Sequence, residues 1–339
     1  MNAVYRFLSW LLPILALAVI VKGAYVRLSD AGLGCPDWPG CYGRLVVPDS
    51  LAEATPEHLA ARPLESGKAW REMIHRYLAS SLGFGILLLA ALAWRNRADP
   101  RQPVLVPLLL VPLVVFQGLL GMWTVTLLLK PLVVTAHLIG GMTVFALLLW
   151  NLLRVKAGDA ARLAAGTSIL GAALVALVAL AVQIFLGGWT SANYAALACT
   201  DFPTCHASWW PNMAFREAFV LWRGLGVNYE FGVLDTPART AIHYTHRLWA
   251  LVTAAAILFA IVRAYRRGGT AGRRLGWCIL AALLVQLALG ISNVLYGLPL
   301  PVAVMHNGMA ALLMASLVTL LFFATRPAGA RPSTRASSS

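Results

Sequence analysis

The sequence predicts an all-α integral membrane protein whose eight transmembrane helices form two duplicated four-helix bundles. Of the 339 residues, 60% are hydrophobic and 12% are charged, which is too apolar for a soluble globular protein. The apolar residues gather into eight runs long enough to cross a bilayer. Matched residues also recur at offsets of 164 to 171, so the last four runs repeat the first four.

Four apolar runs make up the first half: 8–28, 73–94, 103–126 and 131–153. The first run follows Arg6 and is not followed by a convincing cleavage site, so we expect an uncleaved span rather than a signal peptide. A long polar loop, 29–71, separates it from the second run, which carries a His-Arg step at His75. The fourth run carries His137 about six residues from its start.

Four further runs make up the second half: 167–190, 240–263, 275–297 and 300–324. They repeat the same features, with a long loop at 191–239, a His-Arg step at His246 and a later histidine at His306. Four spans per half is an even number, so both halves insert in the same orientation. We therefore expect a pseudo-twofold axis along the membrane normal.

The repeat divides the chain into an N-terminal bundle with its outer loop, a C-terminal bundle with its outer loop, and a tail that we expect to be disordered and cytoplasmic: 1–160, 161–325 and 326–339. The segment from Gly23 to Cys41 matches the segment from Gly187 to Cys205 at a constant offset. Three residues of the third run have counterparts in the seventh: Gln117 with Gln286, Gly121 with Gly290, and Val125 with Val294.

The formal net charge of +14 follows the predicted membrane topology and does not form a patch typical of nucleic-acid binding. If the N-terminus lies inside, fifteen basic residues fall in cytoplasmic segments, opposed only by Asp99 and Asp159. This positive-inside pattern places both termini in the cytoplasm and argues against a nucleic-acid partner. No Arg- and Ser-rich transit segment precedes the first run, so we expect a multi-pass protein of the bacterial cytoplasmic (inner) membrane.

Four of the five cysteines form two short clusters in the outer loops: Cys35 with Cys41, and Cys199 with Cys205. The outer side of a bacterial membrane is oxidising, which favours a disulfide within each cluster. A zinc site built from all four cysteines, or thiols that cycle between redox states, are the alternatives. Cys278 lies inside a span, where a small apolar filler is expected.

Four histidines lie at similar depths in the even-numbered runs: His75, His137, His246 and His306. At 1.5 Å per residue, all four fall within about 10 Å of the outer boundary. Two imidazoles from one bundle can occupy both axial positions of a haem iron. A single buried histidine more often makes an interhelical hydrogen bond, but four at duplicated positions predict two haem sites, one per bundle.

The two halves differ beside the first histidine of each pair. Glu72 lies one turn before His75, whereas His243 occupies the corresponding position before His246. A carboxylate beside a haem ligand can accept a proton or stabilise a developing positive charge, and the alternative is an ion pair with the arginine four residues later. The difference predicts one reactive and one electron-carrying haem, and leaves the role of His243 open.

Three arginines lie where haem propionates would point if both rings stand near the outer surface: Arg27, Arg76 and Arg247. Guanidinium groups suit carboxylates, so these residues are candidate propionate contacts. Interfacial anchoring by snorkelling arginines is the alternative.

The segment Gly23-Ala-Tyr-Val-Arg-Leu-Ser-Asp-Ala-Gly-Leu-Gly-Cys-Pro-Asp-Trp-Pro-Gly-Cys41 and the Glu72-Met-Ile-His75-Arg76 motif closely resemble the haem A synthase family. The later histidines and the eight-span layout extend the resemblance over nearly the whole chain. Ser29 and Gly34 stand where the family more commonly has Thr and Ser. The resemblance implies an oxidoreductase that converts a peripheral methyl group of haem O to a formyl group, giving haem A for terminal oxidases.

The same resemblance implies roles for individual residues. The N-terminal bundle would hold the substrate haem between His75 and His137, with Glu72 needed for turnover, and the product diol would then lose water. The C-terminal bundle would hold a permanent haem b between His246 and His306. The implied partners are haem O delivered by a haem O synthase (a farnesyltransferase), an electron donor such as a ferredoxin, membrane lipid and a possible homo-oligomer.

Two other functions fit a duplicated haem-binding membrane protein. One is a non-catalytic cytochrome b that transfers electrons, and the other is a haem transporter or chaperone. Equivalent sites would suit a simple electron carrier, whereas the difference between Glu72 and His243 favours an enzyme. Pigment extraction separates the possibilities, because the synthase yields haem O or haem A beside haem B.

Overall fold

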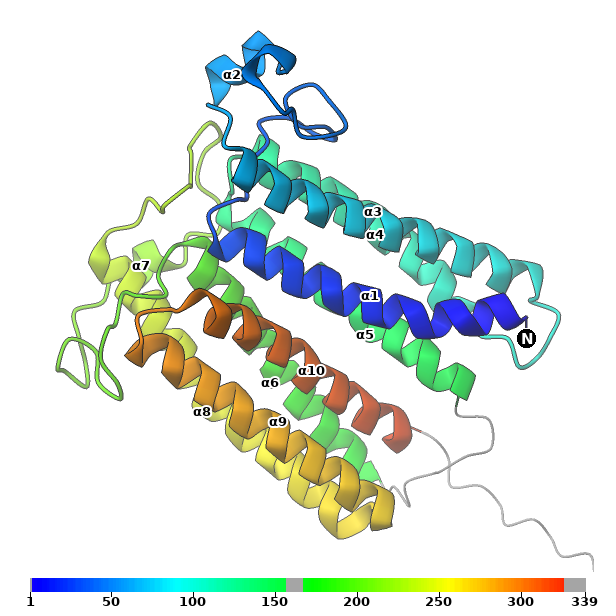
Figure 1. The fold of residues 1–339 in the computed structure, drawn as a ribbon. Coiled ribbons are helices and arrows are strands. Elements are labelled where there is room, and N and C mark those ends of the chain that lie inside the picture. The colour runs from blue at the N-terminus through cyan, green and yellow to red at the C-terminus, as the bar shows by residue number, and fades with distance from the viewer. Residues whose placement is uncertain (1, 157–166, 326–339) are drawn as a thin grey trace, which may run out of the picture.

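The computed structural model describes residues 2–156 and 167–325. Within these ranges every regular element is helical, apart from two isolated β-bridges in the loops. Eight helices are long and apolar enough to cross a membrane, as the sequence predicted (Figure 1): α1 (Ala3–Leu28), α3 (Ser66–Arg95), α4 (Leu105–Thr126), α5 (Pro131–Lys156), α6 (Thr167–Ala192), α8 (Thr236–Arg267), α9 (Gly269–Leu295) and α10 (Leu300–Ala324). The expected tail, 326–339, lies outside the described residues.

Four helices, α1, α3, α8 and α9, begin earlier than the hydropathy of the sequence suggested. Helix α3 begins at Ser66 rather than at residue 73, and α8 begins at Thr236 rather than at residue 240. Their first turns are polar, and Lys68 pairs with Glu65 at 2.9 Å. An apolar run marks the part of a helix that sits in the bilayer, whereas backbone hydrogen bonding continues beyond it.

The long helices pack as two groups of four. In the first group α1 contacts α3 and α5, and α4 also contacts both of them. In the second group α6 contacts α8 and α10, and α9 also contacts both of them. The groups meet where α1 packs on α10, α5 on α6, and α5 on α10 (Figure 1). A twofold axis between the halves would produce this set of neighbours, and the axis itself stays a prediction.

Small residues bring the two groups close together. A Cβ atom on Gly308 of α10 would lie 3.2 Å from Val21 of α1, and one on Gly188 of α6 would lie 3.0 Å from Leu138 of α5. Glycines allow this close approach of backbones, which is a common way for membrane helices to associate. The buried apolar side chains of both groups join into one continuous core across the seam.

Two long segments lie at the ends of the helices away from the N-terminus, which the sequence predicts to be the outer ends (Figure 1). They contain three short helical elements: η1 (Leu51–Glu53), α2 (Pro56–Ala61) and α7 (Phe215–Ala218). The second segment reaches over the first half of the molecule. Arg62 and Glu230 form a two-pronged ion pair at 2.8 and 3.0 Å, and the main-chain N–H of Tyr229 donates to the carbonyl of Leu128. We call residues 222–230 the crossing segment, because they connect the second half to the outer end of the first.

The amino group of Lys130 completes this connection. It donates to the carbonyl oxygens of Arg223 and Gly224, and lies 3.7 Å from the centre of the Trp222 ring. Lys130 is almost fully buried, at 2% exposure, between the ends of α4 and α5. A cationic group can be buried here because carbonyl oxygens and an aromatic face replace water around it.

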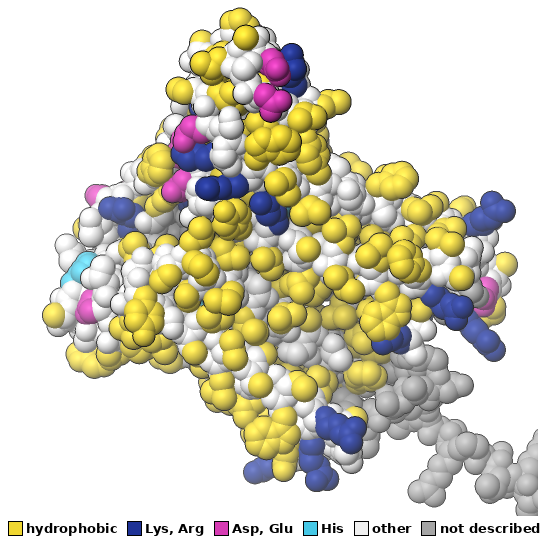
Figure 2. Space-filling model, viewed as in Figure 1, with side chains coloured by type: hydrophobic (Ala, Val, Ile, Leu, Met, Phe, Trp, Pro, Cys, Tyr) yellow, Lys and Arg dark blue, Asp and Glu magenta, His cyan; other side chains and the backbone are white. Residues whose placement is uncertain are grey.

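The surface follows the same plan. Hydrophobic side chains cover the sides of the long helices, and basic side chains lie towards both ends; in the loop region they are mixed with acidic side chains (Figure 2). This distribution fits a multi-pass membrane protein.

Candidate functional site

Each of the four membrane histidines lies against a glycine of the neighbouring helix. His75 of α3 faces Gly23 of α1, and His246 of α8 faces Gly187 of α6. A Cβ atom on Gly23 or Gly187 would lie 2.9 or 3.2 Å from Cε1 of the ring, too close for ordinary contact. The other two histidines are seated in the same way: His137 against Gly121 and His306 against Gly290. The duplicated glycines therefore make room for the duplicated imidazoles.

The histidines lie in two pairs, one in each half. The role of each pair as iron ligands stays a prediction. His75 lies within electrostatic range of His137, and His246 lies within range of His306. Nδ1 of three of these rings, those of His75, His137 and His306, is buried without a hydrogen-bond partner. Two histidine rings that lie in one helical bundle, with a buried ring nitrogen that has no hydrogen-bond partner, suit the axial positions of a haem iron.

Glutamines approach the histidines of the second half. The amide nitrogen of Gln183 lies 3.2 Å from Nδ1 of His246 and donates to the main-chain carbonyl of the same residue at 3.1 Å. The amide nitrogen of Gln286 lies 3.3 Å from Nε2 of His306. The oxygen atoms of both side-chain amides are buried without a partner. His75 and His137 interact instead with the main chain of Val19 and Gln117.

Glu72 and His243 occupy equivalent places and make equivalent contacts. A carboxylate oxygen of Glu72 accepts from the main-chain N–H of Cys35 at 2.9 Å, and Nδ1 of His243 accepts from that of Cys199 at 3.3 Å. Both side chains are buried, at 4% and 5% exposure. Each residue therefore ties the top of its helix to the loop that carries its cysteine pair, and only the first half has an acidic group there.

The arginines of the His-Arg steps are engaged by the same loops. Arg76 pairs with Glu72 and donates to the main-chain carbonyls of the first cysteine loop: those of Asp37, Pro39 and Gly40. Arg247 contacts Nε2 of His243 at 3.3 Å and donates to carbonyls of the second loop: those of Asp201 and Thr204, which match Asp37 and Gly40, and that of Cys199. The structure thus gives both arginines a role in loop attachment, and the predicted contact with propionates stays a prediction.

Arg27 links the two halves at their outer end. Its guanidinium donates to the main-chain carbonyl of Ser191 and lies 4.0 Å from the centre of the Tyr194 ring. It also pairs with Asp30 at 3.8 Å. Nε of Arg27 is buried without a partner, so one donor remains for another group. Its predicted contact with a propionate likewise remains untested.

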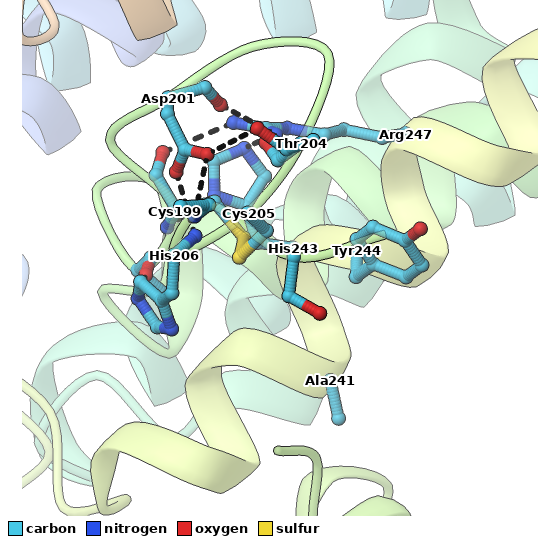
Figure 3. The surroundings of a disulfide bond; sticks show 12 residues. Cys199, Asp201, Thr204, Cys205, His206, Ala241, His243, Tyr244 and Arg247 are labelled. Carbon is cyan, nitrogen blue, oxygen red and sulfur yellow. Dashed lines mark hydrogen bonds between the residues drawn. A yellow bond between two sulfur atoms is a disulfide. The ribbon is translucent and has the colours of Figure 1, made fainter. Parts of the chain in front are cut away.

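Both cysteine clusters form disulfides within their own loops, as expected. The pairs are Cys35 with Cys41 and Cys199 with Cys205, whose Cα atoms lie 4.8 and 4.9 Å apart. In Figure 3 the second disulfide lies above α8, where Arg247 and His243 approach the same loop. The single free cysteine among the described residues is Cys278, which is exposed on the helix surface rather than buried as a filler.

An aspartate organises each disulfide loop from within. Asp37 accepts from the main-chain N–H groups of Tyr42 and Gly43 at 2.6 and 3.0 Å. Asp201 accepts in the same way from His206 and Ala207 (Figure 3). The hydroxyl of Thr204 also donates to Asp201, and this hydrogen bond lowers the pKa of the Asp201 carboxyl to about 2. The loops therefore hold the same conformation at matching positions.

The duplicated arrangement matches a known family over nearly the whole chain. The family described as COX15-CtaA, cytochrome oxidase assembly protein, matches residues 6–318. This chain belongs to that family. The matched residues include all four histidines, both disulfides and the Glu72 position.

Curated relatives of this COX15-CtaA family member are named haem A synthases. The one from Shewanella oneidensis is 47% identical over 328 residues, which span 93% of this chain and 96% of the relative. The one from Rhizorhabdus wittichii is 30% identical and covers 91% of each chain. The one from Halalkalibacterium halodurans is 26% identical and covers 91% of this chain and 93% of its own.

The sequence did not predict the role of several residues in the candidate site of this COX15-CtaA family member. It matched the glycines at Gly23 and Gly187 but did not predict that they seat histidine rings. Gln183 escaped notice because its counterpart in the first half is Val19, so the repeat gave no signal. The loop aspartates, Asp37 and Asp201, lie within the two matched segments, and their shared position two residues after the first cysteine could have indicated a turn-forming role.

Proposed function

We propose that this chain is a haem A synthase, an oxidoreductase that oxidises a peripheral methyl group of haem O to the formyl group of haem A. The curated relatives and the family support this activity. Two hydroxylations and the loss of one water molecule convert the methyl group to the aldehyde. The observation that supports a division of labour is the pair of equivalent histidine sites that differ at Glu72 and His243.

In this proposal the N-terminal half, 1–160, binds the substrate. His75 and His137 hold the iron of haem O from opposite sides, and the glycines behind them leave space for the rings. Their buried, unpartnered Nδ1 atoms fit this role. The substrate brings its own iron, which supplies the redox chemistry of the oxidation.

Glu72 serves as the catalytic carboxylate in this half. It lies one turn before His75 and is almost fully buried. Its contacts with Cys35 and Arg76 fix the direction of the carboxylate. From this position it can accept a proton or stabilise positive charge near the bound haem, where water does not screen it.

In the C-terminal half, 161–325, His246 and His306 would hold a permanent haem b. A bound haem b would supply electron transfer to the substrate site. Residues His246 and His306 fit this cofactor by donor type and pairing. Arg27, Arg76 and Arg247 stand near the outer ends of both sites and are proposed to contact propionates as well as the loops.

The sequence and the proposed activity also suggest where the protein lies and which partners it has. We place the protein in the bacterial cytoplasmic membrane with both termini inside, since most cytoplasmic charges are basic. Haem O would arrive from a haem O synthase, a farnesyltransferase, and electrons from a donor such as a ferredoxin. Homo-oligomers are compatible with this arrangement.

Pigment extraction tests the proposal. The purified protein should contain haem B together with haem O or haem A, whereas haem B alone would indicate an electron-transfer cytochrome. His246→Ala and His306→Ala should each deplete haem B, while His75→Ala should deplete haem O and haem A. Loss of haem B from His75→Ala but not from His246→Ala would reverse the assignment of the two halves.

A further inference from the structure

Two extra positive charges lie beside the first histidine of the first half. The amino nitrogen of Lys22 in α1 is 4.9 Å from the centre of the Tyr25 ring, and the guanidinium carbon of Arg71 in α3 is 5.7 Å from it. Lys22 also lies within electrostatic range of His75. Arg71 precedes His75 by four residues, so it lies one turn away on the same helix face. Both cationic side chains are partly buried.

The second half has apolar residues at the three matching positions. Leu186, Trp189 and Ile242 are the counterparts of the lysine, the tyrosine and the arginine, at the offsets that relate the two halves. All three are buried, at 6%, 1% and 0% exposure. Trp189 and Ile242 share a buried cluster with Ala218 of α7, whose carbonyl accepts from the indole N–H of Trp189. The same place is therefore closed by apolar packing in one half, and is cationic and partly exposed in the other.

The two cations of the first half have no anionic partner in the protein. Within residues 2–156 and 167–325, neither Lys22 nor Arg71 makes an ion pair or a side-chain hydrogen bond. They lie within electrostatic range of each other, so their charges repel. An anion bound between them would remove this repulsion. The neighbouring Arg76 is less available, because it already pairs with Glu72 and donates to three loop carbonyls.

We propose that Lys22 and Arg71 bind the two propionate carboxylates of the haem in the first half, and that this half therefore recognises its haem by charge where the second half does so by apolar burial. The inference rests on the proposed function, which places the substrate haem in the first half and a permanent haem b in the second. Ammonium and guanidinium groups are natural partners of carboxylates. Contacts at a partly exposed edge suit a ligand that must be captured and released at each turnover.

The first experiment measures haem release from the purified holoprotein to an excess of apomyoglobin. Haem O or haem A and haem B are followed separately by pigment analysis of what remains bound. Lys22→Leu and Arg71→Ile place the residues of the second half at the matching positions of the first. Each should speed the loss of haem O or haem A by about tenfold, because a charge-assisted contact is removed, and should leave the loss of haem B unchanged. Salt should speed the loss from the parent more than from the variants, because it screens the contact.

Two control variants separate charge recognition from general effects. Arg71→Lys keeps the positive charge and should release haem O or haem A at close to the parent rate. Lys68→Leu removes a positive charge from the same helix, but Lys68 already pairs with Glu65 at 2.9 Å and has a cationic counterpart, Arg239, in the second half. Its release rates should stay within about twofold of the parent.

The second experiment asks whether the carboxylates are what the two cations bind. After release, the protein is titrated with iron protoporphyrin IX or with its dimethyl ester, in which both carboxylates are blocked. The parent should bind the diacid more tightly than the ester, and Lys22→Leu and Arg71→Ile should each lose most of that preference. The comparison within the parent decides the matter if a variant does not fold.

Three results would overturn the inference. One is release of haem O or haem A from both variants within about twofold of the parent, which would leave the cations as anchors at the membrane interface. Another is equal binding of diacid and ester by the parent. The third is an anionic phospholipid that copurifies with the parent and is lost from the variants while haem release stays the same.

The two proposals fail differently. Parent protein that contains haem B but neither haem O nor haem A contradicts the proposed function. The titration with iron protoporphyrin IX and its ester still tests the role of Lys22 and Arg71 in that case.

Discussion

Glu72 and His243 show how one position can keep its structural contacts and change its chemistry. Both side chains accept a hydrogen bond from the first cysteine of their loop, and both contact the arginine one turn later. The sequence alternatives for Glu72 were a catalytic carboxylate and a simple ion pair with Arg76. The structure contains the ion pair, and the pair also aims the carboxylate, so the two readings are compatible.

Glu72→Gln should lower haem A formation by about two orders of magnitude or more, because it removes the charge while keeping an acceptor for the N–H of Cys35. Haem O or a partly oxidised intermediate should accumulate on the protein. Pigment analysis after expression with a haem O supply measures both effects.

His243→Gln is the matched control, since it alters the equivalent loop contact in the other half. It should leave haem A formation within a fewfold of the parent. Normal haem A formation by Glu72→Gln would remove this carboxylate from the mechanism.

At the scale of elements, each disulfide loop is a copy of the other. Both contain a cis proline at the same place, at Pro39 and Pro203, and both end in an isolated bridge beside the second cysteine. The repeated residues, an aspartate within each loop and an arginine from the helix below it, account for the shared conformation. The sequence repeat therefore predicts that the two disulfide loops share one conformation. It does not predict the hydrogen bonds that hold each loop.

Asp201→Asn should loosen the second loop. The carboxylate accepts from two main-chain N–H groups and from Thr204, and the variant side chain has one acceptor oxygen fewer. Hydrogen exchange at the amides of His206 and Ala207 should become about tenfold faster at neutral pH, which corresponds to a loss of about 1.4 kcal/mol. Mass spectrometry of peptides that span the loop measures the change.

The pKa of Asp201 sets the acid limit of the same loop. Its folded-state pKa of about 2 lies below the ordinary value of 3.8, so its contribution to stability is full above pH 3.8. That contribution falls as pH decreases from about 4 to about 2. Loop protection in the parent should decline across this window, and Asp201→Asn should show no such step. A decline centred near pH 6 would point to another group.

Hydropathy predicted the eight spans well because bilayer burial is a property of each helix alone. The positions of His75 and His246 on their helices followed for the same reason. The early start of α3 at Ser66 did not follow, because a polar first turn has no hydropathy signal. The contacts of Arg76 with loop carbonyls were also missed, since interactions with backbone atoms depend on loop shape rather than on residue type.

At the scale of the whole molecule, the charge distribution predicts which loops lie on the cytoplasmic side of the membrane. Reporter fusions after residues 98 and 269 should report cytoplasm, and insertions near residues 55 and 225 should report the outer side. A fusion after residue 158, outside the described residues, should also report cytoplasm. Inverted reports at two or more of these sites would overturn the depth assigned to the histidines.

The ion pair between Arg62 and Glu230 should stabilise the contact between the halves. Its side chains are 20% and 9% exposed, and it uses two hydrogen bonds. Arg62→Ala should cost about 1–3 kcal/mol and lower the Tm by several degrees. The reversed pair, Arg62→Glu with Glu230→Arg, should recover part of the loss in a thermal scan. An equal Tm in Arg62→Ala and the parent would show that the pair contributes nothing.

The crossing segment could not be predicted from the sequence, because the repeat relates each loop to its own bundle. Lys130, Arg62 and Glu230 have no repeated counterparts that would have indicated a contact between halves. Only the three-dimensional arrangement shows that the second loop covers the first bundle.

This covering contact has a consequence for the order in which the protein is made. The N-terminal bundle leaves the ribosome first, with α3, α4 and α5 complete before residue 160 is reached. Lys130, at its outer end, meets the carbonyls of Arg223 and Gly224 only after more than ninety further residues have been synthesised and carried across the membrane. The half that is synthesised first is therefore the half whose predicted outer end is covered last.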